Sequence, residues 1–173
     1  MAETSVTSPR SEEKRVAITP VQNLMGRINK TSQAIAQRAY EIFEGSGRRF
    51  GHDLEDWFKA EMDLLHQVPV NIVESDENLE VKAEVPGFTE KEIQISVEPR
   101  RLTITGKREA NKEEKKGKAV YSEFSSDQIL RVVDLPARVE AEKVTATLKN
   151  GVVRLIMPKT DEAKTIEIKP KVA

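Results

Sequence analysis

A tight β-hairpin is predicted by the stretch Ala146-Thr147-Leu148-Lys149-Asn150-Gly151-Val152-Val153, near the end of the 173-residue chain. Apolar residues alternate with polar ones before the Asn-Gly pair, which is typical of a strand with one buried face. A type I′ turn requires positive φ at both of its central residues, and Asn-Gly tolerates this well. The stretch therefore indicates an antiparallel sheet.

More strands are expected upstream and downstream, because from Val70 onward the apolar residues keep a period of two. The segments with this pattern are 70–73, 79–85, 93–97, 102–105, 129–133, 144–148 and 152–157. Pro86-Gly87 closes the second of them. Many short strands without crossover helices predict an antiparallel β-sandwich rather than a parallel α/β sheet.

The N-terminal part of the chain has a different pattern. Residues 1–26 are polar and lack a sustained period, so we expect this segment to be disordered. A helix is predicted over residues 28–44, and a second one from an N-cap at Asp53 to about His66. Two short helices bury too little apolar surface to be stable alone, so this helical arm, residues 27–66, is expected to pack on a partner.

A long connection separates Gly106 from Ile129. Its first part, residues 107–118, has nine charges of both signs in twelve positions, which favours a solvated loop over a nucleic-acid site. Residues 119–124 have strand character. A strand held on such an arm can pair with the sheet edge of a second copy, so we expect a dimer formed by strand exchange.

Composition argues against several classes of function. Basic and acidic residues number 28 and 29, so the net charge of −1 gives no attraction to nucleic acid or anionic lipid. The chain has no cysteine, and His52 and His66 lack the spacing of a zinc-protease motif. There is no phosphate-binding loop sequence, and no pair of carboxylates is singled out for acid–base work. We therefore expect a binding protein without catalytic residues, metal or cofactor, not an enzyme.

The first residues lack the apolar core of a signal peptide. No apolar run approaches the roughly 20 residues that a membrane-spanning helix needs. A soluble, cytoplasmic protein is expected.

The chain resembles the α-crystallin domain of the small heat shock proteins over roughly residues 68–159. The stretch that begins at Ala146 is similar to the family's A-x-L-x-N-G-V-L, with Val153 in place of the leucine. Val85-Pro86-Gly87-Phe88 resembles the family's L-P-G turn. The stretch Ile129-x-Arg131-x-Val133-x-Leu135-Pro136 resembles F-x-R-x-F-x-L-P, with aliphatic residues replacing both phenylalanines.

The resemblance implies an immunoglobulin-like β-sandwich over residues 67–160, followed by a C-terminal extension over 161–173. In that extension, Ile166-Glu167-Ile168 matches the family's I-x-I motif. The long charged connection looks like the swapped-strand arm of bacterial and plant members. Residues 35–65 resemble a short bacterial helical domain of unknown function.

The function that this resemblance implies is ATP-independent holding of partly unfolded client proteins by an oligomer built from dimers. The motif residues Ile166 and Ile168 would dock in an apolar groove of another subunit. The groove residues it implies are Ile93, Ile95, Val97, Val144, Ala146 and Leu148.

The dimer interface is expected at Arg131, Val120, Tyr121 and Phe124. A guanidinium among aliphatic residues needs a carboxylate if it is buried, so Arg131 is either an interface residue or an outward-facing strand residue. Client contact is expected at apolar residues of the N-terminal part, namely Val16, Ile18, Phe43, Phe50, Trp57, Phe58 and Leu64.

Two alternatives remain from the sequence. A co-chaperone adaptor would bind a folded chaperone and stay monomeric. Alternatively, the helical arm docks one specific partner, and the sandwich serves only as a scaffold for oligomerisation.

Overall fold

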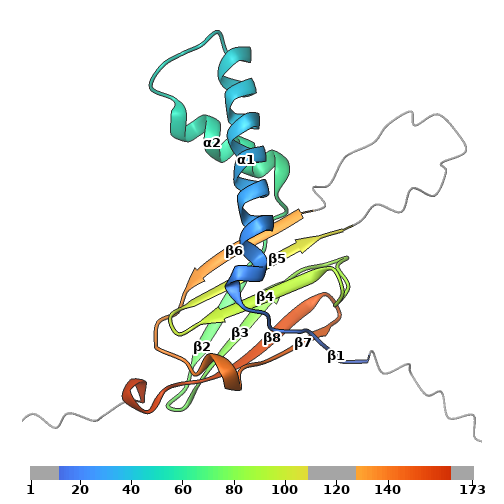
Figure 1. Ribbon diagram of the computed structural model, residues 1–173, viewed down its shortest axis with the longest axis vertical. Helices are drawn as coiled ribbons and strands as arrows, with labels where there is room; N and C mark the ends of the chain where they lie inside the picture. The colour runs from blue at the N-terminus through green and yellow to red at the C-terminus, as the bar shows by residue number, and fades with distance from the viewer. Residues whose placement is uncertain (1–11, 109–127, 165–173) are drawn as a thin grey trace, which may run out of the picture.

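The computed structural model describes residues 12–108 and 128–164, which form an antiparallel β-sandwich with a helical arm standing on it (Figure 1). One sheet has five strands in the order β1-β7-β8-β3-β2, and the other has three in the order β4-β5-β6. The strands are β1 (Lys14–Arg15), β2 (Val70–Glu74), β3 (Asn78–Glu84), β4 (Ile93–Glu98), β5 (Arg101–Lys107), β6 (Gln128–Asp134), β7 (Thr145–Lys149) and β8 (Val152–Pro158). The helices are α1 (Val21–Gly45), α2 (Asp53–Leu64) and two short 3-10 turns, η1 (Ala141–Lys143) and η2 (Asp161–Ala163). The predicted sandwich and its seven predicted strands are confirmed, whereas β1 was not foreseen.

The β7–β8 hairpin has the predicted turn. Asn150 and Gly151 have φ values of 50° and 73°, so both lie in the left-handed region that a type I′ turn needs. The turn sets a register in which Leu148 lies opposite Val153, and both side chains are buried. The hairpin therefore places the apolar residues of both strands in the core.

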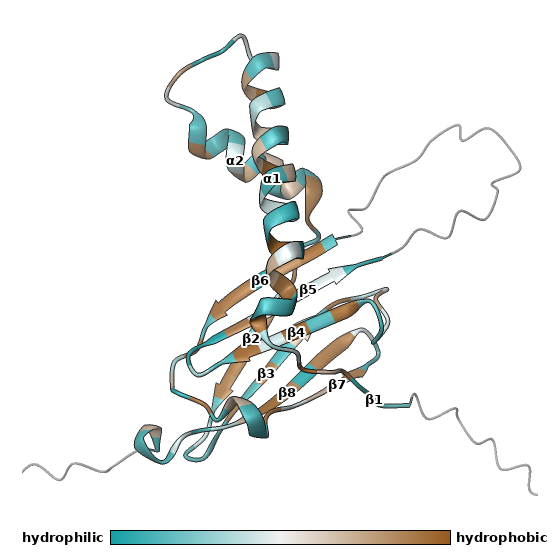
Figure 2. Ribbon diagram, in the orientation of Figure 1, coloured by the Kyte–Doolittle hydropathy of each residue, from teal (hydrophilic) through white to brown (hydrophobic). Residues whose placement is uncertain are grey.

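The core lies between the two sheets and is made from alternate residues of each strand. In β3, for example, Leu79, Val81 and Ala83 are completely buried while the residues between them reach the surface. Figure 2 shows hydrophobic and hydrophilic residues alternating along the strands. Strand β5 is different, because Thr103 and Thr105 on its outer side are also buried. That side is covered by α1, which contacts β4 and β5.

Helix α1 begins at Val21, well before the predicted start at residue 28, and residues 14–20 follow a defined path. The expectation of disorder is therefore wrong for the described part of residues 1–26. The reason is a row of residues with helical spacing, Leu24, Ile28, Thr31 and Ile35, which are buried or half-buried in α1. Leu24 follows two polar residues, Gly26 comes two positions later, and Thr31 is polar, so the row is weak in sequence.

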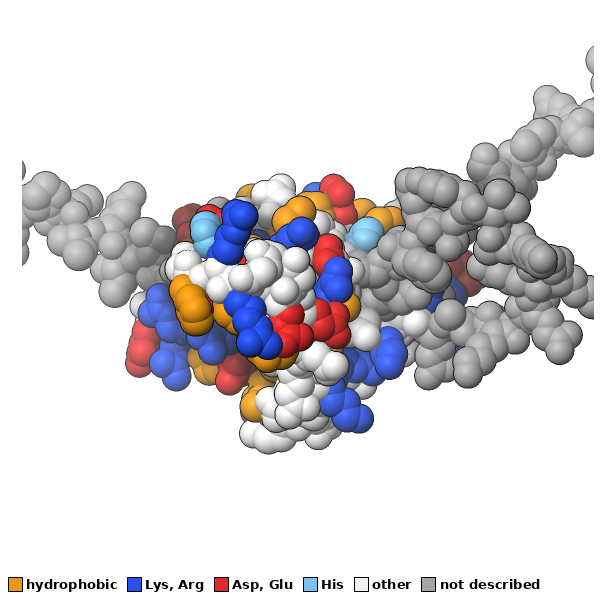
Figure 3. Space-filling view, turned by 90° about the horizontal axis from the view of Figure 1, so that it is seen from above, with side chains coloured by type: hydrophobic (Ala, Val, Ile, Leu, Met, Phe, Trp, Pro, Cys, Tyr) orange, Lys and Arg blue, Asp and Glu red, His pale blue; other side chains and the backbone are white. Residues whose placement is uncertain are grey.

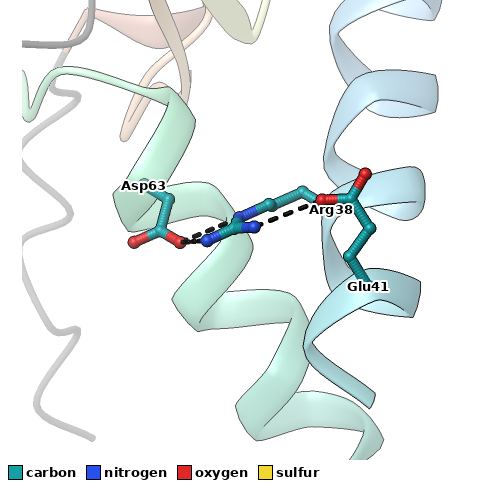
Figure 4. Close-up of polar contacts among 3 residues, drawn as sticks. All are labelled: Arg38, Glu41 and Asp63. Carbon is teal, nitrogen blue, oxygen red and sulfur yellow. Dashed lines mark hydrogen bonds and ion pairs between the residues drawn. The ribbon is translucent and has the colours of Figure 1, made fainter. Parts of the chain in front are cut away.

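Helix α2 starts at Asp53, with His52 as its N-cap, one residue from the predicted cap. It packs against α1, and an ion-pair network links the two helices (Figure 4). Arg38 of α1 donates hydrogen bonds to Asp63 of α2 and to Glu41 of α1, at 3.0 and 3.2 Å. These groups are exposed, so the network mainly orients the helices and adds little stability. Among the described residues, no helix is long and apolar enough to cross a membrane.

Candidate functional site

The six predicted groove residues lie on two strands from different sheets. Ile93, Ile95 and Val97 are on β4, which is an edge of the three-stranded sheet. The others belong to β7 or precede it directly, and β7 is separated from the edge of its sheet only by the two residues of β1. All six side chains are buried.

A segment from the N-terminal part lies along both strands. We call residues 14–19 the strap; in Figure 1 it is dark blue and runs from β1 to the foot of α1. On the β7 side, Lys14 and Arg15 pair with Leu148 and Thr147, and the amide of Val16 donates to the carbonyl oxygen of Ala146 at 3.0 Å.

The strap then reaches the β4 edge. Ile18 forms a parallel bridge with Ile95, and the amide of Thr19 donates to the carbonyl oxygen of Ile95 at 2.8 Å. Because one short segment pairs with β7 and with β4, the structure brings the two sides of the predicted groove to a single ligand, the strap.

Side chains of the strap alternate in the way expected of an extended segment. Val16 is only 5% exposed, Ala17 is exposed, and Ile18 is partly buried against the core. Val16 and Ile18 therefore point toward the sandwich. They were predicted to contact clients, but in this structure Val16 belongs to the core and is not accessible to another protein. Sequence alone missed this because the strap has no strand-like run of its own.

The contacts at the rim of the strap are polar and exposed. Lys14 forms an ion pair with Glu90 at 3.5 Å, and the hydroxyl of Thr147 donates to Glu13 at 2.7 Å. A backbone hydrogen bond and, more weakly, Lys14 lower the pKa of Glu90. An open hollow of about 510 Å³ remains beside the strap, lined by Arg15, Val16, Ile18, Val144, Thr145, Ala146 and Thr147. The strap therefore occupies the groove without filling it.

The helical arm presents a second candidate surface. Phe50, Leu54, Phe58 and Met62 are spaced by four residues, which places the three on α2 along one side of the helix. Their side chains are between 58% and 87% exposed. We call these four residues the arm stripe. Seen from above, hydrophobic side chains reach the surface among charged ones (Figure 3). Leu54 and Met62 were not predicted for client contact, although the spacing from Phe50 was a usable signal.

The other predicted arm residues lie closer to the contact between the helices. Phe43, Trp57 and Leu64 are half-buried, and the indole of Trp57 donates to Glu61 at 3.1 Å. The rings of Phe43 and Phe50 meet edge to face, with centroids 5.7 Å apart. An open hollow of about 430 Å³ lies next to them, lined by Ala36, Ala39, Tyr40, Phe43, Phe50, Asp53, Asp56 and Trp57.

Most of the predicted assembly residues cannot be placed. Val120, Tyr121, Phe124, Ile166 and Ile168 lie outside the described residues. The side chain of Arg131, on β6, is exposed and makes no ion pair within the described ranges. This is the outward-facing orientation, and its interface role stays a prediction. Within the described part, β2 pairs only with β3, so its other edge is open.

In the part of the chain that the structure covers, no group of three or more histidine, aspartate and glutamate side chains is arranged to hold a metal ion. The features that the described residues do offer are the apolar arm stripe and the groove between β4 and β7 with the strap in it.

Comparison with known families matches two parts of the chain. The Hsp20/alpha crystallin family matches residues 71–171, and a family described as a protein of unknown function, DUF2934, matches residues 31–65. The second match coincides with the helical arm and confirms that resemblance without adding a function.

Individual relatives agree. The chain is 35% identical to a probable 15 kDa heat shock protein of Leptospira interrogans, over 58% of this chain and 76% of that protein. It is 32% identical to a 17.8 kDa class I heat shock protein of Arabidopsis thaliana, over 70% of this chain and 88% of the relative. Among solved structures, heat shock protein 16.0 from Schizosaccharomyces pombe superposes with a TM-score of 0.50 at 24% identity, over 62% of this chain and 97% of that one, which supports the fold. The chain therefore belongs to the Hsp20/alpha crystallin family of small heat shock proteins.

Proposed function

We propose that this protein is an ATP-independent chaperone that binds partly unfolded proteins under stress and keeps them from aggregating. Family membership supports a chaperone role. The observation that carries the proposal is the arm stripe, four large apolar side chains held at the surface of an ordered helical arm. Unfolding proteins expose apolar surface, and burying it against such a stripe is favourable. Binding lowers the free concentration of aggregation-prone states by mass action, so no nucleotide is consumed.

Exposed apolar surface of this kind is a liability for an isolated subunit, so the proposal includes self-assembly. The first step would be a dimer in which residues 119–124 of one copy pair with the open edge of β2 in another. Arg131, Val120, Tyr121 and Phe124 would lie at this interface. Deleting residues 107–124 should then give monomers in analytical ultracentrifugation, and dimers that persist would rule out strand exchange.

Larger assemblies would form when Ile166 and Ile168 of one subunit enter the groove between β4 and β7 of another. Burying two isoleucines contributes about 1.5–3 kcal/mol each, and a few strand hydrogen bonds about 0.5–1.5 kcal/mol each. Ordering four residues costs about 1–2 kcal/mol per residue, so the terms nearly cancel. One tail is therefore weak and reversible, whereas many tails in one assembly act together through effective concentration.

The proposed partners are the protein itself and its clients in the cytoplasm. The nearly balanced charge gives nucleic acid or membrane surfaces no electrostatic attraction to the chain. The role that we propose is stoichiometric binding, without a catalysed reaction.

The test is aggregation of a heat-labile protein, followed by turbidity in the absence of nucleotide. We expect the full-length protein to suppress turbidity at a stoichiometric ratio. Equal turbidity with and without it would defeat the holdase proposal.

A second candidate function rests on the separate family match of the arm, which covers residues 31–65. In this alternative the arm binds one folded partner through the hollow beside Phe43 and Phe50. Such a partner would be captured in pull-downs by the native protein without stress, and polar replacement of the arm stripe would leave turbidity suppression intact. If the protein is a holdase, the same replacement of the arm stripe should instead reduce the suppression of turbidity.

A further inference from the structure

The groove that we assign to the C-terminal motif already has an occupant in this structure. The strap pairs with β7 through Lys14, Arg15 and Val16, and with β4 through Ile18 and Thr19. Its two apolar side chains, Val16 and Ile18, face the sandwich. A second segment cannot use the same strand edges and the same apolar surface while the strap is in place.

The strap and the C-terminal motif have the same pattern. Val16-Ala17-Ile18 has aliphatic residues at positions i and i+2 around an exposed residue, and Ile166-Glu167-Ile168 has the same spacing. In an extended segment, residues two apart point to the same side. Both segments therefore offer a matching pair of aliphatic side chains and a strand backbone to β4 and β7.

The strap is held near the groove by its own chain. Pro20, the residue after the strap, is the N-cap of α1. Helix α1 contacts β4 and β5, and its Leu24 is completely buried. A tethered ligand has a high effective concentration, so it competes strongly even if its intrinsic affinity is low. A tail from another subunit meets an occupied site.

The strap is nevertheless built to be displaced. It makes only a few backbone hydrogen bonds, its ion pair from Lys14 to Glu90 is partly exposed, and Ile18 is only partly buried. The hollow beside it leaves room for an incoming segment to make first contacts at Val144 and Ala146. Displacement would also expose Val16 and Ile18, which are two of the residues that the sequence predicted to contact clients.

We propose that Val16-Ala17-Ile18 is an intramolecular competitor of Ile166-Glu167-Ile168 for the groove between β4 and β7. Release of the strap would thus make the groove available to a tail and expose an apolar segment in the same step. This inference rests on the proposed docking of the tail and adds how that docking is controlled.

A reversible lock on the strap tests the proposal. The bond from Val16 to Ala146 makes that pair a hydrogen-bonded one, so the neighbouring Arg15 and Thr147 form a non-hydrogen-bonded pair. Their Cα atoms are then about 4.5 Å apart, within the range for a disulfide. Because the chain has no cysteine, R15C/T147C introduces the only thiols. Arg15 and Thr147 alternate with the buried Val16 and Ala146, so their side chains lie on the side of the strands away from the core.

The lock is placed in the full-length protein that also carries I166A/I168A, so that the protein's own tails do not compete. A fluorescein-labelled peptide of residues 160–173 is then titrated by fluorescence anisotropy against the oxidised and the reduced protein. Mass spectrometry confirms the disulfide. The same I166A/I168A protein without the cysteines, with and without reductant, controls for the reductant. A peptide carrying I166A/I168A controls for binding outside the groove.

We expect oxidation to weaken peptide binding at least tenfold and reduction to restore it. In the opposite direction, V16S/I18S should strengthen binding about tenfold, whereas A17S, at the exposed position between them, should leave it unchanged. Equal affinities in the oxidised and reduced forms would overturn the competition while leaving tail docking intact. If the peptide binds neither the reduced protein nor V16S/I18S, tail docking itself is wrong and the competition is rejected with it. Neither result bears on suppression of turbidity.

Discussion

The amide of Val16 donates a hydrogen bond to the carbonyl oxygen of Ala146 over 3.0 Å, which joins the segment before α1 to a strand near the other end of the chain. Within the described residues, this bond and the one from Thr19 to Ile95 attach the strap to both sheets. The groove, the strap and α1 are therefore mechanically connected, because α1 follows the strap directly and packs on β4 and β5.

Leu24→Ala should loosen the strap from a distance. Leu24 is completely buried in α1, the helix that contacts β4 and β5, and truncating such a leucine typically costs about 2–5 kcal/mol. The N-terminal turns of α1 then open more often, and the amides of Val16 and Thr19 should exchange with solvent faster. Hydrogen exchange measures this. The adjacent Met25→Ala is the control because Met25 is 45% exposed, and unchanged protection in Leu24→Ala would contradict the connection.

Polar replacement of the arm stripe should reduce chaperone activity without unfolding the protein. Phe58 and Met62 are exposed, so F58S/M62S removes apolar contact area for clients at little cost to the fold. We expect a several-fold higher ratio of chaperone to client for the same suppression of turbidity, with Tm nearly unchanged. Met25→Ser is the matched control on α1. Full suppression by F58S/M62S would place client binding elsewhere.

Much of the sandwich follows from local pattern, because most strands from Val70 onward have one face in water and one in the core; β4 and β5, which also bury outer residues, are the exceptions. The turn at Asn150-Gly151 follows for the same local reason, since few other pairs accept positive φ twice. The confirmed strands also show which way the predicted groove residues point, because successive side chains along a strand alternate between the two faces of the sheet.

The strap and a buried lysine could not be predicted in this way, because they depend on contacts between distant segments. Strand β1 consists of Lys14 and Arg15, both charged and exposed, and only its partner β7 makes it a strand. Lys159 resembles any surface lysine in sequence. In the structure its side chain is 1% exposed and its ammonium pairs with Glu74 at 2.5 Å. Both features are set by tertiary pairing, the first with β7 and the second with Glu74, which the neighbouring sequence does not indicate.

Gly151→Ala should destabilise the sandwich. Gly151 has a φ of 73°, and a Cβ there would lie 3.1 Å from the Cα of Pro86, a backbone atom that cannot move aside cheaply. We expect a loss of about 1–2 kcal/mol and a lower Tm by calorimetry. Gly26→Ala, in the interior of α1, has the opposite expected sign because a Cβ there meets no atom of the described residues within 4 Å. It should gain about 0.5–1 kcal/mol. Equal effects of the two changes would refute the strain at the turn.

A pH dependence should arise from Glu80 and Arg154, on the neighbouring strands β3 and β8. Arg154 donates to Glu80 at 2.9 Å, and this hydrogen bond lowers the pKa of Glu80 below its ordinary value of 4.5. The pair therefore stabilises the fold above that value, and its contribution is lost as the pH falls through the lowered pKa. The difference in Tm between wild type and Glu80→Gln should be greatest near neutral pH and vanish in acid.

Thermal melts between about pH 7 and pH 3 check this behaviour. Because both side chains are partly exposed, high salt should also shrink the difference at neutral pH. A difference in Tm that is constant across the pH range would show that Glu80→Gln acts through packing and not through the charge.

Replacing both tail isoleucines should reduce the size of the assembly without dissolving the dimer. I166A/I168A removes the paired aliphatic side chains proposed for the groove, while residues 119–124, proposed for strand exchange, stay intact. Because each tail contact is weak and the contacts act jointly, loss of all of them should convert large particles into species near the dimer. Light scattering measures the mass, and Glu167→Ala, between the two isoleucines, is the control that keeps them. An unchanged mass for I166A/I168A would show that the groove does not hold the oligomer together, and the strap would then be its resident ligand only.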